Sequence, residues 1–269
     1  MQTVGGLVTG LICVLSVVIG VRLLRLGARS KGPERWLGVY FLAASLFGTV
    51  FSCVLYMGWV DPSLSLPAAW FSPLQALHIA SNGAGLFGIW IFTWRTFRPD
   101  SALARAVVTA VGATLLVTFA EIGITDRFAV HILPGANYWI NFGARVSGVV
   151  WMSVESFRYG AMLRRRLRLG LADPLVANRF LLWGSWAAAV VLLNLSDPLA
   201  RLWYCASAGT TTELIPQLAR QMIVVVVGLT SAFGIVAAGC LFLTFFPTAA
   251  YRRWVRDRHE RAFAAERVS

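Results

Sequence analysis

The chain has 269 residues, of which 58% are apolar and only 13% are charged. This excludes an ordinary soluble domain, in which about a quarter of the residues are charged. The formal net charge of +12 comes from arginine, because Lys31 is the only lysine. The arginines flank long apolar segments, so they predict membrane topology and contact with anionic lipid headgroups, and we expect no nucleic acid as a partner.

Seven apolar segments follow one another, each long enough to cross a hydrocarbon layer about 30 Å thick. In chain order they cover residues 5–26, 36–60, 69–97, 101–123, 137–163, 179–199 and 217–246. The predicted fold is an all-α membrane protein with a seven-helix transmembrane bundle in residues 1–249. We expect a basic amphipathic tail in residues 250–269, which forms a short interfacial helix because Trp254 lies among arginines. A solvated charged tail is the alternative.

The arginines predict the direction of each span. The segments after the first, third, fifth and seventh spans carry most of them, whereas the opposite segments carry only Arg127, Arg201 and Arg220. The positive-inside rule then places the N-terminus outside and the C-terminus in the cytoplasm. We expect a multi-pass protein of the plasma membrane, the inner membrane of a bacterial cell.

A short sequence recurs in the two halves of the chain. Residues 24–27 and residues 167–170 both read Leu-Arg-Leu-Gly, and each precedes an arginine that opens the next span. This indicates a parallel duplication of three helices, with the fourth span as linker. Chance recurrence of arginine-leucine loops is the alternative.

Polar residues gather at one depth, near the outer side of the membrane. Groups of this kind are costly within a span and mark functional sites. The candidate ligand-binding residues are His78, Asn82, Glu121, Asn141, Arg145, Asn194, Asp197 and Arg220. We expect an outward-facing pocket between the third and seventh helices, where Arg145 holds an anionic group. His78 and Asn82, four residues apart on one helix face, would supply hydrogen bonds.

The same residues also fit a purely structural role. Arg145 paired with Glu121 or Asp197 would join two helices and bind no ligand. Deeper in the fifth span, the spacing of Glu155 and Arg158 predicts an intrahelical pair. Small residues in the third span, Gly83 to Gly88, indicate close packing against neighbouring helices.

Catalytic and cofactor chemistry finds little support. The chain has three histidines, and a catalytic zinc requires about three His or carboxylate ligands in one place. No pair of intramembrane histidines is placed for a haem, and no phosphate-binding loop or nucleophile elbow occurs. The four cysteines have no metal-binding spacing. We therefore expect no metal, no cofactor and no enzymatic activity.

The number and direction of the helices resemble those of the rhodopsins and G-protein-coupled receptors. The resemblance is one of topology, because the seventh span has no lysine for retinal and Thr93-Trp94-Arg95 lacks the receptors' acidic-Arg-aromatic triplet. Pro247 and the basic aromatic stretch after it resemble the receptors' short eighth helix. The repeated halves also resemble SWEET-type carriers, without their Pro-Gln signature. No functional residue is carried over from either family.

The leading hypothesis is a sensor or receptor-like membrane protein that binds a small, anionic ligand in the outward-facing pocket. A small-solute or ion-coupled transporter is the first alternative. An accessory subunit that packs against another membrane protein is the second. A protein partner in the membrane or the cytoplasm would be expected in the first and last cases.

Overall fold

A computed structural model describes residues 2–60, 66–128, 135–208 and 216–268. Every element in these ranges is a helix, which confirms the all-α prediction. In chain order the helices are α1 (Gln2–Ser30), α2 (Glu34–Tyr40), η1 (Phe41–Gly48), α3 (Thr49–Val60), α4 (Ala68–Phe97), α5 (Ala102–Thr125), α6 (Ala136–Arg168), α7 (Pro174–Ala208), α8 (Pro216–Phe245) and α9 (Ala249–Val268).

Six helical segments within the described ranges are long and apolar enough to cross a membrane. They are Gly6–Ser30, Glu34–Leu55, Ala69–Phe97, Ala102–Thr125, Pro174–Ser207 and Gln221–Phe245. The protein is therefore an integral membrane protein with several crossings. The segment predicted as the fifth span, which lies in α6, is not among the six. Asn137, Asn141 and Arg145 interrupt its apolar residues, and arginines follow at its other end.

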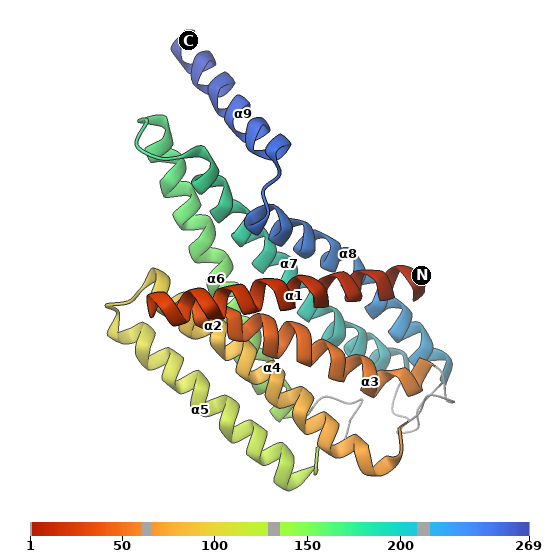
Figure 1. Cartoon of the computed structure of the whole chain (residues 1–269). Helices are drawn as coiled ribbons and strands as arrows, with labels where there is room; N and C mark the ends of the chain where they lie inside the picture. The colour runs from red at the N-terminus through yellow and green to blue at the C-terminus, as the bar shows by residue number, and fades with distance from the viewer. Residues whose placement is uncertain (1, 61–65, 129–134, 209–215, 269) are drawn as a thin grey trace.

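Most of the helices form a ring, and α5 and α9 lie outside it (Figure 1). Around the ring, α1 contacts α2 and η1, these contact α4, α4 contacts α6, α6 contacts α7, α7 contacts α8, and α8 returns to α1. Helix α5 lies on the outside against α4 and α6. Each set of three consecutive spans, before and after α5, is thus a set of neighbours.

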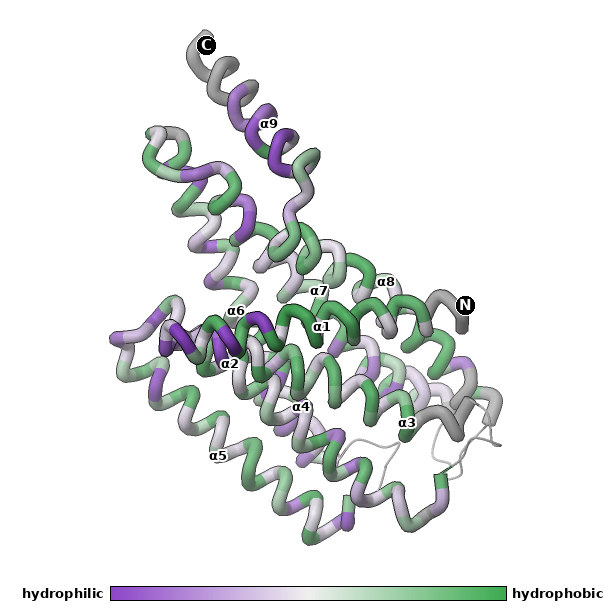
Figure 2. Tube along the Cα trace, viewed as in Figure 1, coloured by the Kyte–Doolittle hydropathy of each residue, from purple (hydrophilic) through white to green (hydrophobic). Residues whose placement is uncertain are grey.

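The bundle has one hydrophilic end. Figure 2 shows hydrophilic residues gathered where α1, α4 and α6 end and where α2, α5 and α7 begin, and again along α9. We call this the arginine-rich end, and the other the opposite end. The expected C-terminal helix is present, but with 20 residues α9 is longer than the short helix predicted. It leads away from the bundle beyond the end of α8 and contacts α7 (Figure 1).

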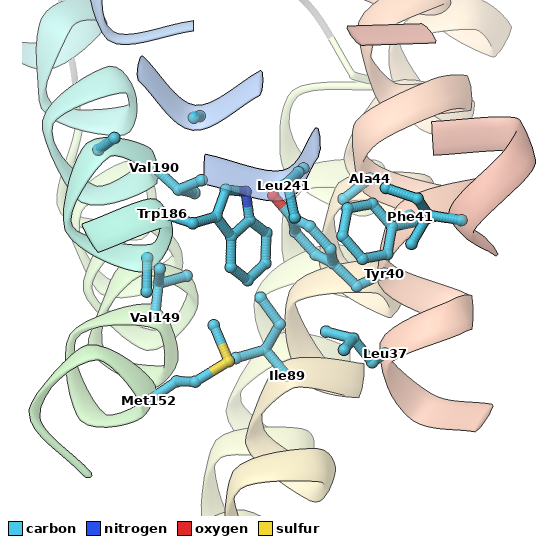
Figure 3. Packing of buried hydrophobic residues seen from close by; sticks show 14 of the residues in the cluster. Leu37, Tyr40, Phe41, Ala44, Ile89, Val149, Met152, Trp186, Val190 and Leu241 are labelled. Atoms are coloured by element: carbon cyan, nitrogen blue, oxygen red, sulfur yellow. The ribbon is translucent and has the colours of Figure 1, made fainter. Parts of the chain in front are cut away.

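The interior of the ring is filled by aromatic and aliphatic side chains from every helix of the ring (Figure 3). Trp186 of α7, which is 2% exposed, stacks on Phe41 with ring centroids 5.5 Å apart. Tyr40 meets the same indole edge-on at 5.6 Å. Lipid tails are as apolar as these side chains, so close packing, rather than removal of water, holds membrane helices together.

Glycines allow α4 to approach η1 and α2 closely. A Cβ atom on Gly85 would lie 2.6 Å from the backbone nitrogen of Ala44, and one on Gly88 would lie 2.6 Å from the carbonyl oxygen of Trp36. The predicted close packing of the third span is therefore confirmed at these two positions. Gly83, in contrast, has no neighbour within 4 Å of such an atom.

The repeated Leu-Arg-Leu-Gly sequences adopt different structures. Residues 24–27 lie inside α1, which continues to Ser30. Residues 167–170 cross the end of α6, and Gly170 takes a left-handed backbone conformation with φ of 69°. Local structure therefore gives the repeated sequence no support as a sign of duplication.

Candidate functional site

Arg145 lies in α6 with its Nε atom fully buried and without a hydrogen-bond partner. The residue as a whole keeps some exposure. No side chain in the described ranges forms an ion pair with its guanidinium group, although the carboxylate of Asp197 lies within electrostatic range. A buried charge without a partner costs several kcal/mol, as an order of magnitude, so its retention needs an explanation.

Asp197 of α7 does not serve as the partner of Arg145, because two other groups occupy it. Arg201 Nε donates a hydrogen bond to Asp197 Oδ2 at 2.8 Å, and the Tyr138 hydroxyl donates to the same oxygen at 3.0 Å. The guanidinium carbon of Arg201 also lies 5.7 Å from the centre of the Tyr138 ring. The predicted Arg145–Asp197 pair is therefore wrong, since a nearer arginine on the same helix takes the carboxylate.

His78 and Asn82 of α4 lie together against the end of η1. His78 Nδ1 is 3.0 Å from the Gly48 carbonyl oxygen. A carbonyl only accepts hydrogen bonds, so Nδ1 carries the proton and Nε2 is the acceptor of the neutral ring. Asn82 Nδ2 donates to the His78 carbonyl oxygen at 2.9 Å. A Cβ atom on residue 48 would lie 2.6 Å from Asn82 Nδ2, so a larger residue there would require the Asn82 side chain to move.

Electrostatics connect these two groups of side chains. Arg145 and Asp197 lie near enough for their charges to act on His78, and α6 packs against both α4 and α7. We call this set of residues the Arg145 cluster: His78, Asn82, Tyr138, Arg145, Asp197 and Arg201. The cluster combines one unpaired cation, one neutralised carboxylate and an imidazole, a set suited to an anion that also accepts or donates hydrogen bonds.

Four of the predicted residues lie outside this cluster as described. Asn141 Nδ2 donates to Thr118 Oγ1 at 3.0 Å and joins α6 to α5. Asn194 Nδ2 donates to the Val190 carbonyl oxygen of its own helix at 2.8 Å. Glu121 is exposed on α5 and forms no ion pair with Arg145. The side chain of Arg220 lies outside the described part of the chain.

Tyr138 and Arg201 belong to the cluster but were not among the predicted site residues. Tyr138 lies near the start of the predicted fifth span, where aromatic residues are common at the membrane interface. Arg201 falls outside the predicted sixth span, which ends at residue 199. Helix α7 instead continues through Pro198 to Ala208, and Arg201 is 7% exposed. The spacing of Asp197 and Arg201, four residues apart, was the signal that could have revealed the pair.

A second charged site lies in α6 nearer the arginine-rich end. Arg98 Nε, at the end of α4, lies 3.0 Å from Glu155 Oε1. Trp151 Nε1 donates to the same oxygen at 3.4 Å. The predicted Glu155–Arg158 pair is therefore wrong: Arg158 is exposed, and the long side chain of Arg98 reaches the carboxylate from the neighbouring helix.

Two tryptophans connect the Arg145 cluster to the Arg98–Glu155 pair. Trp90 Nε1 donates to the carbonyl oxygen of Ala144, the residue before Arg145, at 2.9 Å. The Trp90 ring lies 5.4 Å from that of Trp151, which bonds Glu155. Contacts thus run along the α4–α6 interface from the backbone beside Arg145 to the Arg98–Glu155 pair.

A groove of about 410 Å³ lies elsewhere, between α7 and α8. Trp203, Gln221, Val224 and Val225 line it, and it is shallow and mostly apolar. Such a surface on a membrane helix is suited to lipid chains. It includes no residue of the Arg145 cluster.

No protein-family model, curated protein or solved structure matches the chain. Within the described ranges, no three His, Cys, Asp or Glu side chains are grouped as metal ligands would be.

Proposed function

We propose that this protein is a sensor or receptor-like membrane protein that binds a small anionic ligand at the Arg145 cluster. The observation that carries the proposal is Arg145, whose buried Nε has no hydrogen-bond partner and whose guanidinium group forms no ion pair in the described ranges. A carboxylate or a similar anion would supply the missing partner through charge-assisted hydrogen bonds. The cost of burying Arg145 alone would then be offset when the ligand binds.

The proposal includes seven crossings, with α6 as the fifth. At 33 residues α6 is long enough to span a membrane, and it lies between α4, α5 and α7. Two of its polar side chains, Asn141 and Glu155, meet neighbouring helices rather than lipid. The arginine distribution supports a cytoplasmic arginine-rich end and an external N-terminus in a bacterial inner membrane. The matching neighbour relations before and after α5 support a duplicated three-helix unit.

A sensor fits the contacts better than an ion-coupled transporter does. Transport of this kind needs an acid that is free to bind and release a cation near the middle of the bundle. Glu155 is engaged by Arg98 and Trp151 instead. The tryptophan contacts along α4 and α6 offer a route by which ligand binding would shift the arginine-rich end.

Thermal unfolding of the purified protein in detergent tests the proposal. Acetate, succinate, citrate, phosphate and sulfate are each added at millimolar concentration. A ligand at 100 times its Kd stabilises the folded state by about 2.7 kcal/mol, so a specific anion should raise the Tm measurably. In Arg145→Met this shift should disappear, and in Arg145→Lys it should persist in part because the charge remains.

Arg158→Gln is the matched control, because it removes an exposed arginine from the same helix. It should leave the shift unchanged. The proposal is wrong if none of these anions stabilises the wild type, or if the shift persists in Arg145→Met. Uptake of the stabilising anion into proteoliposomes, abolished by Arg145→Met, would identify a transporter instead.

A further inference from the structure

We propose that the junction between α7 and α9 is a binding surface for anionic lipid headgroups. The proposal does not depend on a ligand at the Arg145 cluster, which lies toward the opposite end of the bundle. Its basis is the way α9 is held against α7 and the arginines that this contact leaves exposed.

The contact joins two segments far apart in sequence. Asn178, in the first turns of α7, donates a hydrogen bond to the Tyr251 hydroxyl near the start of α9. Val255, one turn after Tyr251 on the same face of α9, is 7% exposed. The apolar side of α9 therefore packs against the bundle, and the opposite side of the helix faces away from it.

That other side is basic. Arg179 follows Asn178, while Arg252 and Arg253 follow Tyr251, and Arg256 shares a face with Arg252. All four are exposed, and in the described ranges no hydrogen bond or ion pair engages their side chains. We call them the junction arginines. Four guanidinium groups around one helix contact form a site complementary to phosphate groups.

The junction lies close to the end of the last membrane span, which favours lipid as its ligand. Only residues 246–248 separate α8 from α9. The headgroup layer is roughly 5–8 Å thick on each side of the hydrocarbon core, and the first turn of a helix rises about 5.4 Å. Arg252 and Arg253 follow the end of the last apolar span by only seven and eight residues, which favours a place near the headgroup layer.

The side chain of Trp254 also supports a lipid-binding surface at the junction. It is 49% exposed, stacks on Tyr251 with ring centroids 6.0 Å apart, and lies under the guanidinium group of Arg258 at 5.4 Å. Tryptophan is enriched at membrane interfaces, because its indole is apolar on its faces and donates a hydrogen bond at its edge. An exposed tryptophan among arginines suits lipid headgroups and the adjoining chains.

Lipid titration with native mass spectrometry tests the proposal. The full chain in dodecyl maltoside is titrated with dioleoyl phosphatidylglycerol or dioleoyl phosphatidylcholine, and bound lipid is counted. We expect phosphatidylglycerol to bind about tenfold more tightly, given the attraction of each arginine near an anionic surface. Replacing the four junction arginines by glutamine should weaken its binding about tenfold, and replacing them by lysine less than about threefold.

The matched control replaces Arg22, Arg25, Arg29 and Arg105 by glutamine, four exposed arginines elsewhere. It should change phosphatidylglycerol binding less than about threefold, since it removes the same charge away from the junction. An equal loss in the control overturns the proposal, as does equal binding of the two lipids by the wild type. Displacement of bound phosphatidylglycerol by millimolar inorganic phosphate would assign the site to free phosphate. A heptaglutamate peptide that binds without competition from lipid would assign it to an acidic protein.

Discussion

Helix α6 carries two buried charged side chains about three turns apart, and they differ in one respect. Glu155 has partners on two sides, Arg98 from α4 and Trp151 from its own helix. Arg145 has no hydrogen bond at Nε, although a carboxylate, Asp197, lies within electrostatic range. The same helix therefore carries one charge that is neutralised, at Glu155, and one that is not, at Arg145 toward the opposite end.

The difference separates structural from functional charge. A paired buried charge holds helices together. Removing one partner leaves the other charge buried alone, at a large desolvation cost. An unpaired one weakens the folded state and is retained for another reason, which we take to be a ligand. Removal of the two arginines should thus change stability in opposite directions.

The largest expected effect is that of Arg98→Gln, which leaves the carboxylate of Glu155 buried without its cation. Breaking a fully buried pair costs 3–5 kcal/mol, and the partial exposure of Arg98 reduces this to about 2 kcal/mol. Unfolding by SDS in mixed micelles, followed by circular dichroism, measures the loss. Arg158→Gln should change the unfolding free energy by less than about 0.5 kcal/mol, because that arginine is exposed. Equal losses of unfolding free energy in the two variants would indicate that Glu155 pairs with Arg158 of its own helix as well.

Arg145→Met should act in the other direction and stabilise the protein in the absence of ligand by about 1 kcal/mol. Methionine has a similar length and no charge to bury, so the desolvation cost disappears while the packing of the side chain remains. The same SDS titration measures it. The sites lie about 15 Å apart along α6, so the double variant with Arg98→Gln should be additive within about 0.5 kcal/mol. Destabilisation by Arg145→Met alone would mean that the guanidinium has a structural partner.

The sequence predicted the all-α fold and its apolar helices, because both depend on local patterns. Long apolar runs define α1, α5 and α8, and the spacing of His78 and Asn82 placed them on one face. The partner of Glu155 could not be predicted in this way. Arg98 precedes Pro99 and was assigned to the end of a span, and only the packing of α4 on α6 brings it to the carboxylate. Helix η1 is a π-helix, which has wider turns than an α-helix, and the apolar residues of Phe41–Gly48 do not distinguish the two.

The smallest expected effect sharpens the comparison within the Arg145 cluster itself. Tyr138→Phe removes the hydroxyl that donates to Asp197 and leaves Arg201 in place, so Asp197 stays neutralised. Hydrogen bonds between membrane helices contribute about 0.6 kcal/mol on average, and we expect a loss of that size in the SDS titration. Asn194→Ala is a suitable control, because within the described ranges the Asn194 amide donates only to the Val190 carbonyl oxygen of its own helix, at 2.8 Å. If Tyr138→Phe instead costs several times as much, the hydroxyl is what keeps Asp197 away from Arg145, and the guanidinium is unpaired because Tyr138 and Arg201 hold its natural counter-ion.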